Sequence, residues 1–92
     1  MKFTVNHARA LMGNDISVRV EADEGKAIQR VQTELDGFEL ANDQLADPSD
    51  SYERTFLGAG TAGPGTEHTL VVSVEQDDEK IHSSTSIWAD SN

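Results

Sequence analysis

The most regular segment of the chain reads Ile16-Ser17-Val18-Arg19-Val20-Glu21-Ala22, with apolar residues at even positions and polar or charged residues between them. A period of two is typical of a β-strand with one buried and one solvated face. Residues 67–75 repeat the pattern, so Leu70, Val72 and Val74 are expected to face inward. A disordered chain has no reason to keep this alternation. We therefore predict a folded domain, although only 36% of the residues are hydrophobic and the mean hydropathy is −0.52.

Shorter alternating segments predict further strands on either side of these two. They cover residues 2–6, 31–35, 38–40, 51–57 and 80–89. Residues 8–12 are expected to form a helical turn. Residues rich in Gly, Asp, Asn and Pro predict turns at 23–26 and 76–79, a loop at 41–50 and a Gly-rich loop at 58–65.

Residues 24–36 fit two structures. Ile28, Val31 and Leu35 have the spacing of a helix face, and Gly37 stands where a helix would end. Residues 31–35 also alternate as a strand does, and Asp36-Gly37 is a strong signal for a two-residue hairpin turn. We favour the strand because another short alternating run follows the Asp-Gly pair.

Strands at intervals of about ten residues, with turn signals between them, predict an antiparallel sandwich. The expected fold is all-β: an antiparallel β-sandwich of about seven strands, formed by residues 1–92 as a single domain. The alternative is an α+β fold, in which one helix at about 24–36 packs on an antiparallel sheet.

Two segments carry a family resemblance. Residues 65–74, followed by an acidic hairpin and a last strand rich in Ser and Thr, resemble the final two strands of bacterial immunoglobulin-like and fibronectin type III-like modules. Residues 31–40 look like the central hairpin of the same modules. The Cys pair and core Trp of antibody domains are absent, since Trp88 lies near the end of the sequence. The resemblance implies that the all-β fold is an immunoglobulin-like antiparallel β-sandwich of about seven strands with a binding or spacer role, and it assigns no functional residue.

The charge excludes some partners. Seven Lys and Arg against 17 Asp and Glu give a formal net charge of −10, and the basic residues are scattered singly along the chain. Nucleic acids and anionic membrane surfaces attract basic patches, so neither is expected to bind. Any protein partner should be neutral or basic, and mutual repulsion favours a monomer.

Other features bear on the compartment and on cofactors. The chain has no cysteine, which excludes disulfides, thiolate metal sites and a Cys nucleophile. The first residues lack the apolar stretch of a secretory signal, and no run approaches the roughly 20 apolar residues of a membrane span. We expect a soluble protein that is cytoplasmic or exported without a visible signal, and we expect no cofactor.

Residues Gly58 to Gly63 match the pattern G-x-G-x-x-G of dinucleotide-binding loops. That site needs a helix directly after the glycines, because the helix N-terminus binds the pyrophosphate. Here Pro64 and a β-prone segment follow instead. We interpret the glycines as a surface loop.

The acidic turn at Asp77, Asp78 and Glu79 is the candidate metal site. Clustered carboxylates in a turn supply the oxygen ligands that calcium prefers, although the spacing of an EF-hand is absent. Solvated charge that keeps a small domain soluble explains the same residues without a ligand.

Trp88 and His82 are the candidate interaction residues. On the last strand both alternate with Ile81 and Ile87, so they share the opposite face, where Trp88 lies in an interaction patch or packs on a neighbouring loop. His7, His68 and His82 are too far apart to suggest a metal site. Tyr52, Phe56 and Phe38 are expected in the core.

These observations predict a non-catalytic protein-interaction or spacer module, so we do not expect an enzyme. The alternative is a small calcium- or ligand-binding protein that uses the acidic turns and the Gly-rich loop.

Overall fold

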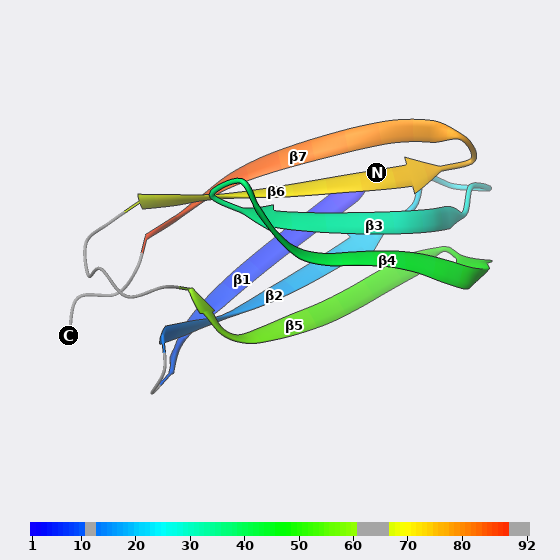
Figure 1. Cartoon of the computed structure of the whole chain (residues 1–92). Coiled ribbons are helices and arrows are strands. Elements are labelled where there is room, and N and C mark those ends of the chain that lie inside the picture. Colours follow the sequence, from blue (N-terminus) through cyan, green and yellow to red (C-terminus); the bar gives the residue numbers. More distant parts are fainter. Residues whose placement is uncertain (11–12, 61–66, 89–92) are drawn as a thin grey trace.

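The computed structural model describes residues 1–10, 13–60 and 67–88, and the side chains of residues 1–6, 15–57 and 67–86 within them. This part of the chain contains seven strands and no helix (Figure 1). The strands are β1 (Lys2–Ala10), β2 (Gly13–Glu21), β3 (Ile28–Leu35), β4 (Phe38–Ser49), β5 (Ser51–Gly60), β6 (Glu67–Gln76) and β7 (Glu79–Trp88).

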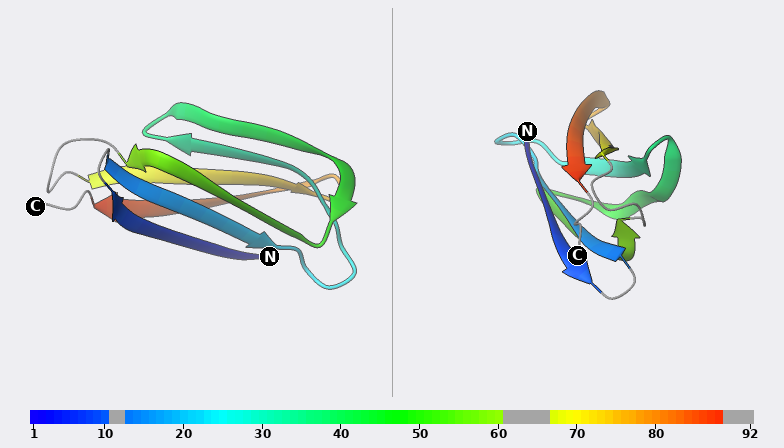
Figure 2. Two further views of the ribbon diagram at one scale, coloured as in Figure 1. Left: turned by 90° about the horizontal axis from the view of Figure 1, so that it is seen from below. Right: turned by 90° about the vertical axis from the view of Figure 1, so that its left-hand side faces the viewer.

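The strands form two sheets that pack face to face. One sheet has the order β1-β2-β5 and the other β4-β3-β6-β7, and all neighbouring strands are antiparallel (Figures 1 and 2). The predicted immunoglobulin-like sandwich of about seven strands is confirmed. The fourth strand pairs with the third, whereas in constant-type immunoglobulin domains it joins the sheet of the first two strands.

The alternative helix at 24–36 is not formed. Residues 23–27 connect the two sheets, and β3 pairs with β4 on one side and β6 on the other. Val31, Thr33 and Leu35 are all buried, as a strand in the middle of a sheet requires. A helix would place Thr33 away from the face shared by Val31 and Leu35, so burial of all three selects the strand.

The core consists of alternating, mostly β-branched side chains from both sheets. Each fully buried aliphatic side chain contributes about 1.5–3 kcal/mol relative to an exposed one. The buried hydrophobic residues are Ile16, Val18, Val20, Ile28, Val31, Leu35, Ala41, Phe56, Leu70, Val72 and Val74.

The predicted loop at 41–50 is wrong, because most of it belongs to β4. Its register against β3 shifts twice: Thr33 pairs with Ala41 but Glu34 with Glu39, and a second irregularity follows Ile28. Such shifts insert unpaired residues and destroy the period of two that identifies a strand. Pro48 is tolerated because β4 is an edge strand.

Two further expectations need correction. Residues 8–10 are extended within β1 rather than a helical turn, and residues 11–12 lie outside the described part. Phe38 is 77% exposed, because it follows the hairpin turn on an edge strand. Phe56 is buried, as expected. Tyr52 packs against the core but is partly exposed.

Both predicted hairpin turns are present. Asp36 and Gly37 have φ angles of 50° and 84°, and Asp77 and Asp78 have φ angles of 47° and 66°. Positive φ at both central residues is typical of the type I′ turn, whose twist matches that of the flanking strands. Gly adopts this region freely, and Asp is among the few other residues that are enriched there.

Gln76 at the end of β6 is fully buried and holds the connection between the sheets. Its Oε1 accepts a hydrogen bond from the backbone N–H of Asp23 at 2.8 Å, and its Nε2 donates to Asp23 Oδ2 at 3.0 Å. The Asp23 carboxylate also pairs with the amino group of Met1. One amide side chain therefore fixes the position of the β2–β3 connection.

The substitution Gln76→Leu keeps the approximate volume of the side chain but leaves the backbone N–H of Asp23 without its acceptor. We expect the free energy of unfolding to fall by about 1–3 kcal/mol in urea titrations. The matched control is Gln44→Leu on the exposed edge of β4, which should change it by less than about 0.5 kcal/mol. Equal effects of the two substitutions would contradict the role assigned to Gln76.

Thr33 supplies a second test of the core. It is fully buried in β3, and its Oγ1 has no hydrogen-bond partner among the described residues. Thr33→Val replaces this hydroxyl with a methyl group of similar size, so we expect stability to rise by about 1 kcal/mol. Thr69→Val on the solvated face of β6 serves as the control. A loss of stability in Thr33→Val would show that the hydroxyl has a stabilising partner.

Candidate functional site

The outer face of the four-stranded sheet presents polar side chains in ordered rows. The register pairs Arg30 with Glu75 and Glu75 with Lys80 across β3, β6 and β7. The adjacent row pairs Gln32 with Ser73, and Ser73 with His82. Because alternate residues of a strand share a face, these two rows lie side by side on the surface opposite the core.

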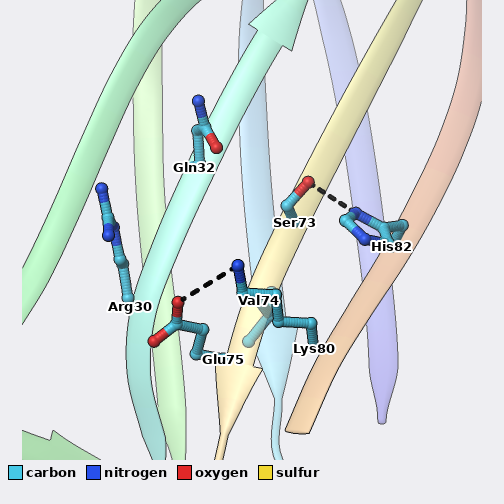
Figure 3. A pocket seen from close by; sticks show the side chains of 7 residues that line it. All are labelled: Arg30, Gln32, Ser73, Val74, Glu75, Lys80 and His82. Atoms are coloured by element: carbon cyan, nitrogen blue, oxygen red, sulfur yellow. Dashed lines mark hydrogen bonds and ion pairs between the residues drawn. The ribbon is translucent and has the colours of Figure 1, made fainter. Parts of the chain in front are cut away.

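The two rows enclose a shallow depression of about 240 Å³ (Figure 3). Charged and hydrogen-bonding groups dominate its lining. The lining residues are Arg30, Gln32, Ser73, Val74, Glu75, Lys80 and His82.

Neighbouring residues position several of these groups. Arg30 Nε donates to Asn42 Oδ1 at 2.6 Å, and Gln32 Nε2 donates to Glu39 Oε1 at 3.0 Å, so β4 orients both side chains of β3. Lys80 Nζ lies 3.9 Å from Glu75 Oε1. The depression therefore offers both donors and acceptors, which suits the docking of a polar group from a ligand or a partner.

Ser73 and His82 form the one pair in the depression that resembles a nucleophile and its base. Ser73 Oγ lies 2.8 Å from His82 Nδ1, within the distance that such a pair needs. Catalytic pairs also need a group that orients the base and a site that excludes water. His82 is exposed, and among the described residues no carboxylate bonds to its other ring nitrogen. The geometry matches a surface hydrogen bond.

The two predicted interaction residues both belong to β7. His82 lines the depression. Trp88 pairs with Glu67 at the far end of the strand, and its side chain lies outside the described part. Whether Trp88 forms an interaction patch or packs on a loop stays a prediction.

The predicted metal residues lie in the turn between β6 and β7, where all three make contacts within the protein, two of them through their side chains. Asp77 Oδ1 accepts a hydrogen bond from the N–H of Ala27 at 3.3 Å, and Glu79 Oε2 lies 3.4 Å from Lys26 Nζ. The N–H of Asp78 donates to Gln29. Among the described residues no three His, Asp or Glu are arranged to hold a metal ion. Calcium binding at this turn stays a prediction.

The Gly-rich segment lies only partly within the described chain. Residues 58–60 end β5, and residues 61–66 lie outside the described part. The predicted loop at 58–65 is therefore wrong for residues 58–60, which are part of the sheet, and the rest of it lies outside the described part.

Two ionised carboxylates link the strands away from the depression. Asp43 of β4 accepts a hydrogen bond from Tyr52 Oη at 2.5 Å, and its two oxygens lie 2.8 Å from Arg54 Nη1 of β5. The hydrogen bond from Tyr52, followed by that from Arg54, lowers the pKa of Asp43. Burial raises the pKa of Tyr52, as does Asp43. This contact connects the two sheets at the β4–β5 side.

The second carboxylate is Asp36 in the β3–β4 turn. Its Oδ2 lies 2.6 Å from Nδ1 of the buried His68, and its Oδ1 accepts the N–H of Thr69 at 2.9 Å. The bond to His68 is the larger cause of the lowered pKa of Asp36, and the Thr69 bond adds to it. His68 is thus a buried partner of this turn.

The sequence pattern singles out His82, but it does not show that Arg30, Ser73 and Lys80 are its neighbours. Alternation alone predicts that each of these residues faces outward. Their proximity depends on the register of three strands, which the sequence does not reveal before the sheet order is known.

No family model and no curated protein matches the chain. Among solved structures, it is similar to one described as fibronectin(III)-like modules of Clostridium thermocellum CbhA. The identity is 21%, the match covers 95% of this chain and 97% of that chain, and the TM-score is 0.49. The described part of the chain contains no helix long and apolar enough to cross a membrane. The arrangement of the strands is that of an immunoglobulin-like or fibronectin type III-like sandwich, which confirms the expected resemblance at the level of the fold.

The Asp36–His68 contact makes stability depend on pH. Because the pKa of Asp36 is lower in the folded chain than its ordinary value of 3.8, the carboxylate stabilises the fold above about pH 4. That contribution is lost as the pH falls through the lowered pKa. Asp36→Asn keeps an acceptor for Thr69 but presents an N–H₂ group to His68, so its stability should fall less steeply between about pH 5 and pH 2.

Urea unfolding at a series of pH values measures this difference. The control is Asp47→Asn at an exposed carboxylate of β4, which should follow the unmodified chain. If Asp36→Asn also followed the unmodified chain at every pH, Asp36 would not be the group responsible.

Proposed function

We propose that the chain is a non-catalytic module that separates and connects the segments on either side of it. The observation that carries this proposal is the placement of the first and last strands. The chain enters the sandwich at one end of its long axis and leaves at the other (Figure 2). The molecule measures 44 × 20 × 19 Å, so passage along the long axis gives the greatest separation that this fold allows.

The register explains this placement. Lys2 at the start of β1 pairs with Glu21, and the connection from Glu21 leads to Ile28, which pairs with Gln76. The start of β7 pairs with Gln76 as well. The start of β1 and the start of β7 therefore lie at the same end, and β7 carries the chain to the opposite end.

This geometry also determines how the module bears load. A force between the two ends would pull β1 along β2 and β7 along β6, parallel to the strands. The hydrogen bonds of each ladder would then be strained together rather than one after another. Nine residue pairs join β1 to β2 and ten join β6 to β7, so both terminal strands are held along their full described length.

Single-molecule pulling tests the proposal. With handles at the two ends of the chain, we expect unfolding at a force severalfold higher than with handles at the first residue and at position 24. Glu24 lies in the β2–β3 connection, at the same end as Lys2, so the second geometry opens the β1–β2 ladder one bond at a time.

The absence of native cysteine lets Glu24→Cys carry the handle specifically. Unfolding of the unlabelled variant in urea shows whether this substitution leaves the fold intact. Equal, low unfolding forces in the two geometries would overturn the proposal that the chain spaces its neighbours under load.

A further inference from the structure

The sandwich has four edge strands, and three of them carry features that block further strand pairing. Unpaired edges attract other strands, and proteins protect them with bulges, prolines and charges. β4 has two register shifts and Pro48, and β5 has a shift against β2 together with Glu53 and Arg54. β1 carries Lys2 and Arg9.

The fourth edge, β7, has no register shift and no proline, and its two charged residues, Glu79 and Lys80, stand together at its start. Its pairing with β6 runs without a shift from Gln76–Glu79 to Glu67–Trp88. After Glu79 and Lys80, residues 81–88 contain no charged residue, no Pro and no Gly. The unpaired backbone groups of a long and regular strand therefore face outward along one side of the larger sheet.

The inward side chains of β7 are only partly covered. Ile81, Ser83 and Thr85 are half-buried, and β1 lies across from this edge with Phe3 and Val5 also partly exposed. A strand added beside β7 would cover this seam between the sheets. It would thus gain backbone hydrogen bonds and apolar contact together.

We propose that β7 binds an extended segment of a partner polypeptide as an additional antiparallel strand. Antiparallel pairing makes the more stable ladder and continues the pattern of this sheet. The segment should carry apolar side chains at alternate positions, where they meet the seam. This binding role adds to the spacer role proposed above, and neither depends on the other.

Charge defines the partner further. The acidic turn of Asp77, Asp78 and Glu79 precedes β7, and an antiparallel strand brings its C-terminal end beside this turn. Basic residues at that end of the segment would be attracted. A second copy of this chain is disfavoured, because each copy carries a net charge of −10.

The probe is the peptide TVTVTVKK, acetylated and amidated, added to the full chain. Amide hydrogen exchange followed by NMR is the readout. At saturating peptide, the alternate β7 amides that do not bond to β6 should exchange at about one tenth of their free rate or more slowly. The outward amides of β4 should keep their exchange rates. The reversed charge pattern KKTVTVTV should bind about threefold more weakly at low salt.

A matched pair of variants locates the site. Thr85→Lys places a charge that points into the seam, a device that natural edges use against strand addition, and it should weaken peptide binding about tenfold. Ala46→Lys adds the same charge to the opposite edge of the same sheet and should leave binding unchanged. Exchange of the β3 amides shows that each variant is folded.

Three outcomes would overturn the proposal. The first is no change in β7 exchange at millimolar peptide. The second is equal weakening by Thr85→Lys and Ala46→Lys. The third is protection of β7 that rises with protein concentration without peptide, which would assign the edge to a second copy. None of these outcomes would affect the spacer proposal, which the pulling experiment tests separately.

Discussion

Three alternating apolar runs that pack against one another determine the rest of this structure. They are residues 16–20 of β2, 31–35 of β3 and 70–74 of β6, and their inward side chains are almost completely buried. A shift of one residue in any of these strands would turn its buried side chains to solvent. The packing therefore fixes the register, and the register in turn places Gln32, Ser73 and His82 in one row on the outer face.

The regular strands and turns could be predicted because their signals are local. The alternation of residues 16–22 and 67–75 and the Asp36-Gly37 turn each lie within a few consecutive residues. Only residues 38–40 of β4 could be predicted in this way, because the irregular pairing of the rest with β3 breaks the alternation. Gln76 and His68 were missed for another reason: their partners, Asp23 and Asp36, are more than 30 residues away in the sequence.

The candidate site could likewise be predicted from the sequence only in part. Alternation on β7 places His82 on the solvated face, but its contact with Ser73 follows from the β6–β7 register. The acidic turn is correctly located by composition, while the roles of its residues depend on contacts with Lys26 and Ala27 of the β2–β3 connection and with Gln29 of β3. Composition thus locates charged groups, whereas tertiary structure decides what they contact.

The central position of β3 is tested most directly by NMR distances between backbone protons. The account predicts cross-strand contacts from Gln32 to Asn42 on one side and to Ser73 on the other. Both sets must appear together if β3 joins β4 to β6. Contacts between residues three apart within 24–36, without cross-strand contacts, would show a helix and contradict the sheet on which the outer face and the β7 edge depend.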